Sequence, residues 1–383
     1  MDAVHDSSIR PLTSLRFIAA LLVFLSHYGG YYNYGRAEQF WQSIFIEGHA
    51  GVTIFFVLSG FLITLRYFPA VTERRFSLYD YFLRRAARIL PLYWTILALM
   101  FAGASLALFQ IYAPVPLTNW TLTQGYFYDI STSVIFTGWS LTAEESFYLI
   151  APVILHFCAA FGQDMRAVLS TLLVWVVGLF GIGLIGVWIA QSGSLNQPYG
   201  FMRDTSFMIY ATLFGRGFNF GVGIFLAWLY LKYRDHLWQH PSSSRKSLIL
   251  FSLSALGILS AQVAMNIYGG AISGWMFNQF IALFAGFVIL SLTCPTSGAA
   301  RLLNKSLPVY MGHISYALYL LQATPIARIL FPILNQSGLA LYAVMNGVSA
   351  IFYEVIERPG KRFVLRAGAW INAKAVKLRR ARA

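Results

Sequence analysis

Charged residues are scarce in this sequence, and that scarcity excludes an ordinary soluble domain. Of its 383 residues, 58% are hydrophobic and only 11% are charged, whereas soluble domains typically carry about 25% charged residues. Apolar stretches of about 20 residues, the length needed to cross a bilayer, recur along the chain. We predict an all-α polytopic membrane protein, a bundle of about ten transmembrane helices. The expected spans are residues 12–30, 49–67, 91–110, 137–160, 168–190, 209–231, 247–268, 273–293, 309–331 and 339–356.

Acidic residues are rarer than basic ones, and the basic ones are unevenly placed. The chain has 14 Asp and Glu against 28 Lys and Arg, a net charge of +14. If the N-terminus is cytoplasmic, the inner segments hold 23 basic residues and the outer loops only two, Arg36 and Arg203. Because Lys and Arg concentrate in cytoplasmic loops, we expect both termini in the cytoplasm, with a basic tail against anionic lipid head groups. Charge dispersed over short loops argues against nucleic-acid binding.

Cysteine is almost absent, which argues against a disulfide or metal framework. The two cysteines, Cys158 and Cys294, lie at or near span ends on the expected cytoplasmic side. The sequence also lacks a Cys/His cluster, a Walker loop, a dinucleotide fingerprint and a His-Glu-x-x-His helix, so we predict neither a metal site nor a nucleotide hydrolase. We expect no permanently bound cofactor. The first ten residues do not read as a cleaved signal peptide.

Two ionisable side chains interrupt the first apolar stretch. Arg16 and His27 are eleven residues apart, so on an α-helix they share one face, about 16 Å apart along the axis. Such groups usually face a protein interior or a wet cavity, because burying them in lipid is costly. A neutral imidazole can take a proton from an attacking hydroxyl and return it to a leaving group, and arginine suits a phosphate. For His27, a hydrogen-bonded structural histidine is the alternative.

A second polar cluster opens the fourth stretch, where Glu144 and Glu145 are adjacent. Successive helical residues diverge by about 100°, so only one of them shares a face with His27, and we choose Glu144. The alternative is a pair of helix-start carboxylates stabilised by the macrodipole. In the second stretch, Ser59 lacks a Gly-x-Ser-x-Gly elbow and is a weak nucleophile candidate, and Gly60 is expected to permit close helix packing.

Basic residues also gather between the second and third stretches. We predict an amphipathic helix on the cytoplasmic surface over residues 68–90. Arg85 and Arg88 are three residues apart and thus adjacent on one helix face, which can hold phosphates. Pro91 is expected to open the next span, where its missing N–H costs little.

Taken in order, these segments resemble the membrane acyltransferase-3 family, whose members O-acylate sugars, glycans and some small molecules. The resemblance extends over almost the whole chain. This chain departs from the family pattern at Gln322, where many relatives place a histidine. The matching pieces are Arg16 with His27, Gly51 and Val52 through Phe55 to Phe61, Arg85 and Arg88 with Pro91, Trp139 to Leu141 through Glu144 to Phe147 and Tyr148, Ile314 to Leu320, and Glu357 to Pro359.

The resemblance implies an acyl-CoA co-substrate, usually acetyl-CoA, loaded from the cytoplasm, and a hydroxyl acceptor on an envelope or exported glycan or related small molecule. It implies the bacterial inner (cytoplasmic) membrane, an acyltransferase domain over residues 1–366 and a basic cytoplasmic tail over 367–383. Because the chain ends in this tail, we expect the type without a fused hydrolase-like domain.

The roles that follow are those of an acid–base reaction. We expect His27 to act as the general base and Glu144 to orient the imidazole or the sugar, with an acetyl-histidine intermediate equally allowed. Arg16, Arg85 and Arg88 are expected to bind the phosphates of acyl-CoA. Further candidates for binding substrate are Ser59, Trp139, Ser140, Glu145 and Tyr148.

One alternative function stays open from the sequence. Arg16, Arg216 and Arg328 all lie inside predicted spans, and in a transporter for an anionic solute they would line a permeation route without chemistry. A glycan flippase or scaffold is a third interpretation. Binding of acetyl-CoA would distinguish the acyltransferase from both.

Overall fold

The computed structural model describes residues 2–28, 49–106, 117–161, 164–193 and 198–382. Within these ranges the chain is helical, and the only strand-like pairing is an isolated antiparallel bridge between Phe127 and Phe201. The helices are α1 (Asp2–Tyr28), α3 (His49–Thr72), α4 (Leu78–Ser105), α5 (Leu117–Trp120), α6 (Gly138–Phe161), α7 (Met165–Gln191), α8 (Thr205–Ala211), α9 (Leu213–Leu237), α10 (Ser243–Tyr268), α11 (Ala271–Leu292), α12 (Gly298–Leu303), α13 (Ser306–Leu321), α14 (Pro325–Ile333), α15 (Gly338–Phe352) and α16 (Arg358–Arg382). Short 3₁₀ turns are η3 (Gln124–Tyr126), η4 (Tyr128–Ile130) and η5 (Pro198–Gly200).

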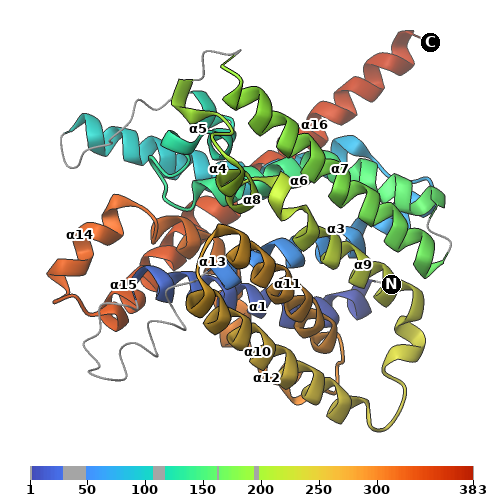
Figure 1. Cartoon of the computed structure of the whole chain (residues 1–383). Coiled ribbons are helices and arrows are strands. Elements are labelled where there is room, and N and C mark those ends of the chain that lie inside the picture. The colour runs from blue at the N-terminus through green and yellow to red at the C-terminus, as the bar shows by residue number, and fades with distance from the viewer. Residues whose placement is uncertain (1, 29–48, 107–116, 162–163, 194–197, 383) are drawn as a thin grey trace.

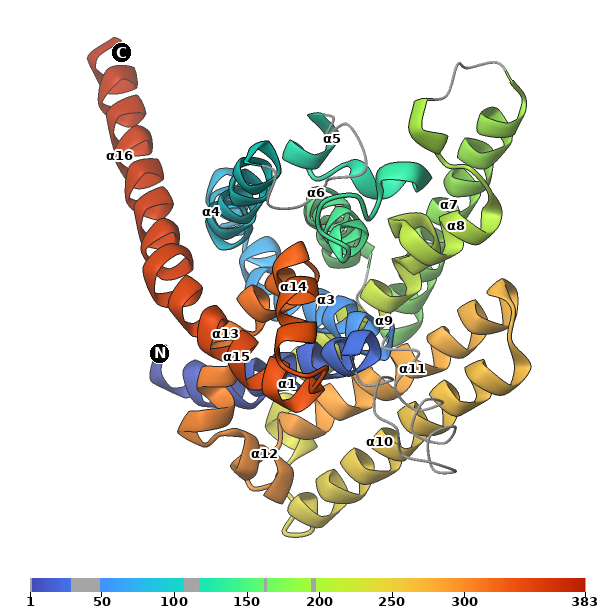
Figure 2. The same ribbon diagram turned by 90° about the vertical axis from the view of Figure 1, so that its left-hand side faces the viewer.

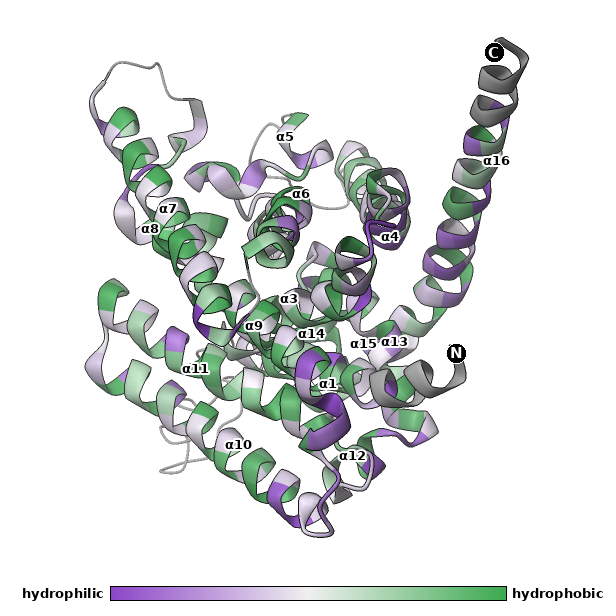
Figure 3. Cartoon of the chain, turned by 90° about the vertical axis from the view of Figure 1, so that its right-hand side faces the viewer, coloured by the Kyte–Doolittle hydropathy of each residue, from purple (hydrophilic) through white to green (hydrophobic). Residues whose placement is uncertain are grey.

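The predicted class of fold is confirmed. In the described part of the chain, nine helices are long and apolar enough to cross a membrane, and one bent pair brings the number to ten. Each of the ten expected stretches falls on one of them. Helices α7 and α10 expose many large apolar side chains, as a lipid-facing surface requires, and hydrophobic residues predominate along both ribbons (Figure 3).

Helix α3 lies at the centre and positions the functional region. It packs against α1, α6, α9 and α11, and the ribbon shows α1 and α3 surrounded by the other helices (Figure 1). The approach of α3 to α9 depends on Gly60, where an added Cβ would lie 2.3 Å from the carbonyl oxygen of Phe220. The prediction that Gly60 permits close packing is therefore confirmed. Gly312 of α13 plays the same part against α1, since its Cβ would lie 2.0 Å from the carbonyl oxygen of Thr13.

The basic segment after α3 does not form a separate surface helix. Its C-terminal part is the beginning of α4, which runs unbroken from Leu78 through Pro91 to Ser105. Proline inside a helix removes one backbone hydrogen bond and usually marks a start or a kink, which explains the different expectation. The carbonyl of Pro91 accepts a hydrogen bond of 2.7 Å from the hydroxyl of Thr95.

The ninth expected span is broken in two. Helices α13 and α14 meet at 94°, with Pro325 at the start of α14. Proline disfavours helical geometry in the residue before it, Thr324, and has no N–H to donate to the carbonyl of Leu321; α13 ends at Leu321. The carbonyls of Gln322 and Ala323 at the break accept hydrogen bonds from the Tyr28 hydroxyl, at 2.9 Å, and the Phe136 N–H, at 3.0 Å. Irregular backbone at membrane depth is tolerated where protein groups satisfy it in this way.

The chain ends in a long helix. A π-helical turn at Tyr353–Glu357 joins α15 to α16, and α16 extends beyond the bundle (Figure 2). Hydrophilic residues recur over residues 358–374 of this helix (Figure 3). Its first half packs along α4, where the Tyr79 hydroxyl donates to the carbonyl of Gly368 at 2.8 Å. The expected basic tail thus begins inside α16.

Candidate active site

A small polar cavity lies where α1, α3, α4, α6 and α13 meet. Its volume is about 40 Å³. Two arginines, Arg16 of α1 and Arg88 of α4, line it together with the carboxylate of Glu144. Its other polar lining residues are Ser59, Ser140, Ser315, Tyr316 and Tyr319. We call this space the arginine cavity; it joins two cations and one anion in the interior of the bundle.

Glu144 is held by two hydroxyl groups. Its Oε1 accepts a hydrogen bond of 2.5 Å from Ser59 Oγ, on α3, and a second one from the hydroxyl of Tyr148, one helical turn further along α6. A carboxylate that accepts two hydrogen bonds has a fixed orientation. Glu145 differs, because its Oε1 is buried and has no hydrogen-bond partner among the described residues.

His27 lines a larger neighbouring cavity of about 540 Å³, which we call the histidine cavity. Its imidazole lies edge-to-face against Phe136, with ring centroids 5.4 Å apart. Among the described residues, neither ring nitrogen of His27 makes a hydrogen bond to the protein. His27 is only half-buried, so its ring nitrogens are available to a ligand in this cavity. Trp139, another predicted residue, lines the same cavity.

The two cavities adjoin, because Val52 and Tyr319 line both of them. Between them the hydroxyl of Tyr319 lies 2.5 Å from Ser140 Oγ. Arg16 and His27, from the same helix, line one cavity each, as a shared face of α1 requires. The order along this path is therefore arginine cavity, Tyr319–Ser140 contact, histidine cavity.

Two predicted site residues lie elsewhere than expected. Arg85 does not line the arginine cavity; its guanidinium carbon lies 5.9 Å and 5.4 Å from the ring centroids of Tyr67 and Tyr148, and its buried Nε has no hydrogen-bond partner among the described residues. Glu144 makes its hydrogen bonds to hydroxyls of α3 and α6, so no described contact joins it to His27.

Sequence reasoning assigned no role to three residues that line cavities together with His27. Tyr319 was part of the quoted segment Ile314–Leu320 but had no role of its own. Phe136 and Gln322 line a third space, of about 430 Å³, with His27 and Arg328. The amide of Gln322 is buried and has no hydrogen-bond partner among the described residues. The available signal was Pro325, which begins α14 three residues after Gln322.

No group of residues that could hold a metal ion exists in the described part of the chain. The site therefore offers cations, one carboxylate, hydroxyls and an imidazole. These groups can bind a polyanion and move a proton, which is the chemistry of acid–base group transfer.

Comparisons with known proteins agree with this chemistry. A family model described as "Acyltransferase domain" matches residues 11–354. The chain is 26% identical over 360 residues to O-acetyltransferase OatA of Staphylococcus aureus strain NCTC 8325 / PS 47 and equally to OatA of strain COL. Each alignment covers 85% of this chain and 55% of the relative, so the chain spans about half the length of these relatives. No solved structure matches the chain.

Proposed function

Because the chain belongs to the acyltransferase-3 family, we propose that it is a membrane O-acyltransferase. In this proposal it moves an acyl group, acetyl in the simplest case, from acyl-CoA on the cytoplasmic side to a hydroxyl of an envelope or exported glycan or related small molecule. The observation that carries the proposal is the adjacency of the arginine cavity and the histidine cavity on one face of α1. The names of the similar proteins, which are O-acetyltransferases, support it.

The arginine cavity suits the phosphate-bearing end of the donor. Arg16 and Arg88 supply two positive charges there, and charge-assisted hydrogen bonds to phosphate are among the strong ones. Glu144, held by Ser59 and Tyr148, balances part of this charge while the site is empty. Arg85 lies one helical turn from Arg88 and stays a candidate for the outer phosphates. The thin pantetheine arm then has to pass Tyr319 to bring the thioester to His27.

The chemistry proceeds at the imidazole of His27. The acceptor hydroxyl gives its proton to the unbonded ring nitrogen while its oxygen attacks the thioester carbonyl carbon. The C–S bond then breaks, the new ester forms, and the imidazolium returns the proton to the thiolate of CoA. Holding both reactants in one water-poor space supplies orientation, worth several kcal/mol in well-aligned reactions. In the alternative two-step route, the acyl group moves first from the thioester to His27 and then from His27 to the acceptor hydroxyl.

The test compares two histidines in the purified protein. We expect His27→Ala to lower acetyl transfer from radiolabelled acetyl-CoA at least about 100-fold, as loss of a general base does, while acetyl-CoA still binds in calorimetric titration. His156→Ala is the matched control, because this ring lies outside both cavities and contacts the carbonyl of Pro152. Unchanged turnover by His27→Ala, or absence of acetyl-CoA binding to the wild type, would contradict the proposal and favour transport.

A further inference from the structure

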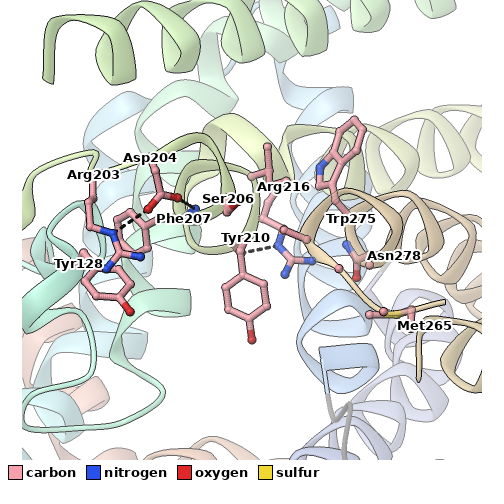
Figure 4. A pocket seen from close by; sticks show the side chains of 15 residues that line it. Tyr128, Arg203, Asp204, Ser206, Phe207, Tyr210, Arg216, Met265, Trp275 and Asn278 are labelled. Carbon is pink, nitrogen blue, oxygen red and sulfur yellow. Dashed lines mark hydrogen bonds and ion pairs between the residues drawn. The ribbon is translucent and has the colours of Figure 1, made fainter. Parts of the chain in front are cut away.

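A separate cavity of about 360 Å³ lies at the connection between α10 and α11, beside α8 and the start of α9. Figure 4 shows the side chains that surround it, with Tyr210 between Arg203 and Arg216. Four of its fifteen lining residues are aromatic, and it has the form of a ligand pocket: an apolar lining with a few polar groups. None of its lining residues has a role in the reaction described above.

Arg216 is the most unusual group in this wall. It is only 3% exposed, and its Nε donates to the carbonyl of Tyr210 at 2.7 Å. Its guanidinium carbon also lies 5.2 Å from the ring centroid of Tyr210 and 5.9 Å from that of Trp139. Its Nη1, however, is buried with no hydrogen-bond partner among the described residues, and no described carboxylate pairs with it. A buried cation without a counter-charge is unfavourable by several kcal/mol, so this position favours an incoming anion.

Asn278 supplies a second donor to the same cavity. Its Oδ1 accepts a hydrogen bond from the hydroxyl of Thr53, which leaves the Nδ2 group buried and without a partner among the described residues. Buried donors are nearly always satisfied, and exceptions call for a reason. One charged and one neutral donor, each lacking an acceptor, line one cavity. A carboxylate or phosphate has the oxygens to satisfy both.

Arg203 lines the same cavity but already has its counter-charge. Its Nε donates to Asp204 Oδ2 at 2.7 Å, and its guanidinium lies over the ring of Tyr128, 3.2 Å from the centroid. Burial alone would raise the pKa of Asp204, but the N–H of Phe207 and the Arg203 guanidinium outweigh it and lower that pKa. Asp204 therefore stays ionised and compensates Arg203, which makes Arg203 the natural control for Arg216.

The cavity adjoins the histidine cavity, because Tyr128, Phe207 and Tyr210 line both. A ligand that extends from one cavity into the other would contact both Arg216 and His27. The aromatic faces between them suit the apolar faces of a sugar ring. We propose that Arg216 binds an anionic group, a carboxylate or a phosphate, of the hydroxyl-bearing acceptor, so that the preferred acceptor is an acidic sugar. The assignment of the ligand as acceptor rests on the proposed function.

The test measures binding without any acyl donor, so that it is independent of catalysis. The full-length protein in phosphatidylcholine nanodiscs is titrated with p-nitrophenyl β-D-glucuronide, p-nitrophenyl β-D-glucoside 6-phosphate and the neutral p-nitrophenyl β-D-glucoside. We expect at least one acidic probe to bind about tenfold tighter than the neutral one, the lower range for a hydrogen bond to a charged group. Equal affinity for all three probes would overturn the proposal, even if acetyl transfer occurs.

Three variants test which side chains cause the preference for an acidic probe. Arg216→Gln should remove it, and Arg203→Gln, the matched exposed arginine, should retain it. Asn278→Asp is nearly isosteric, keeps an oxygen for the Thr53 hydroxyl and places a carboxylate in the cavity, so it too should remove the preference. If Arg216→Gln fails to fold, Asn278→Asp still tests the assignment of the anion site. A preference that survives both the Arg216 and the Asn278 substitutions would overturn the assignment.

A lipid head group is the other source of a phosphate, and a change of lipid separates it from the acceptor. The titrations are repeated in nanodiscs that contain phosphatidylglycerol. We expect the same preference there. If phosphatidylglycerol abolishes it, the cavity holds a lipid phosphate and the acceptor assignment is overturned. If the acidic preference holds but acetyl transfer is absent, the anion site stands and the proposed function fails.

Discussion

Replacing Arg88 with alanine should weaken binding of the acyl donor without unfolding the protein. Arg88 is half-buried and lines the arginine cavity with Arg16. In the empty protein it has a like charge beside it in Arg16 and an unlike charge in Glu357, on which it acts electrostatically. It also acts on Lys361, a like charge, and on Glu145, an unlike one, so its loss removes two repulsions and two attractions. We expect the free energy of unfolding to change by less than about 1 kcal/mol, as for other partly exposed charges.

The effect on the donor should be much larger. A hydrogen bond to a charged group contributes about 1.5–3 kcal/mol, and because Arg88 is only half-buried we take the lower value. This corresponds to a rise of about tenfold in KM for acetyl-CoA. The value of kcat should change little, because Arg88 and His27 line different cavities. A change in KM alone is the signature of a residue that binds ground state and transition state equally.

The assay measures initial rates against acetyl-CoA concentration at a fixed, saturating acceptor concentration. The matched control is Arg84→Ala, which removes the same charge from an exposed position one turn earlier in α4. Acetyl-dephospho-CoA, which lacks the 3′-phosphate, then shows by a double-mutant cycle whether that phosphate is the group contacted. A KM within twofold of the wild type, or an equal rise in Arg84→Ala, would refute the phosphate role of Arg88.

Two further predictions concern stability. Gly312→Val should destabilise the protein by about 1–3 kcal/mol, as overpacking does, because an added Cβ meets the Thr13 carbonyl of α1. Unfolding in SDS measures the change in stability. A stability equal to that of the wild type would contradict the close approach of α13 to α1. The folded-state pKa of Asp204 lies below its ordinary value of 3.8, so its contribution to stability is complete above that value and is lost as the pH falls through the folded-state pKa. Asp204→Asn keeps a good N-cap oxygen but loses the charge. We therefore expect the free energy of unfolding of this variant to fall less than that of the wild type between pH 6 and pH 3. If the two free energies fall in parallel with pH, the result argues against the ion pair.

Hydropathy alone was enough to predict the spans. The bilayer requires about 20 apolar residues in a helix for each crossing, and each such stretch can be recognised from its own residues alone. The relative placement of Arg16 and His27 was also local, since both lie on α1 and helical periodicity fixes their common face. Both residues do lie on α1, and each lines a cavity.

Contacts between helices could not be predicted in the same way. Ser59 donates to Glu144 across 85 positions of sequence, and nothing in either segment specifies the partner. Arg216 appeared only as a charge inside a span, because its unsatisfied Nη1 and the donor of Asn278 are visible only after the helices pack. The number of apolar residues in a span likewise could not predict the 94° bend before Pro325, since a bent span has the same composition as a straight one.

The contact between Tyr319 and Ser140 has a consequence for the cell as well as for the reaction. An enzyme that receives one reactant from each face of a membrane needs an opening toward each face, and a continuous water column would dissipate the proton gradient. In the proposed reaction, the bulky Tyr319 side chain, hydrogen-bonded to Ser140 between the two cavities, interrupts that column while no acyl chain passes. A smaller residue in place of Tyr319 should therefore make cells leaky to protons.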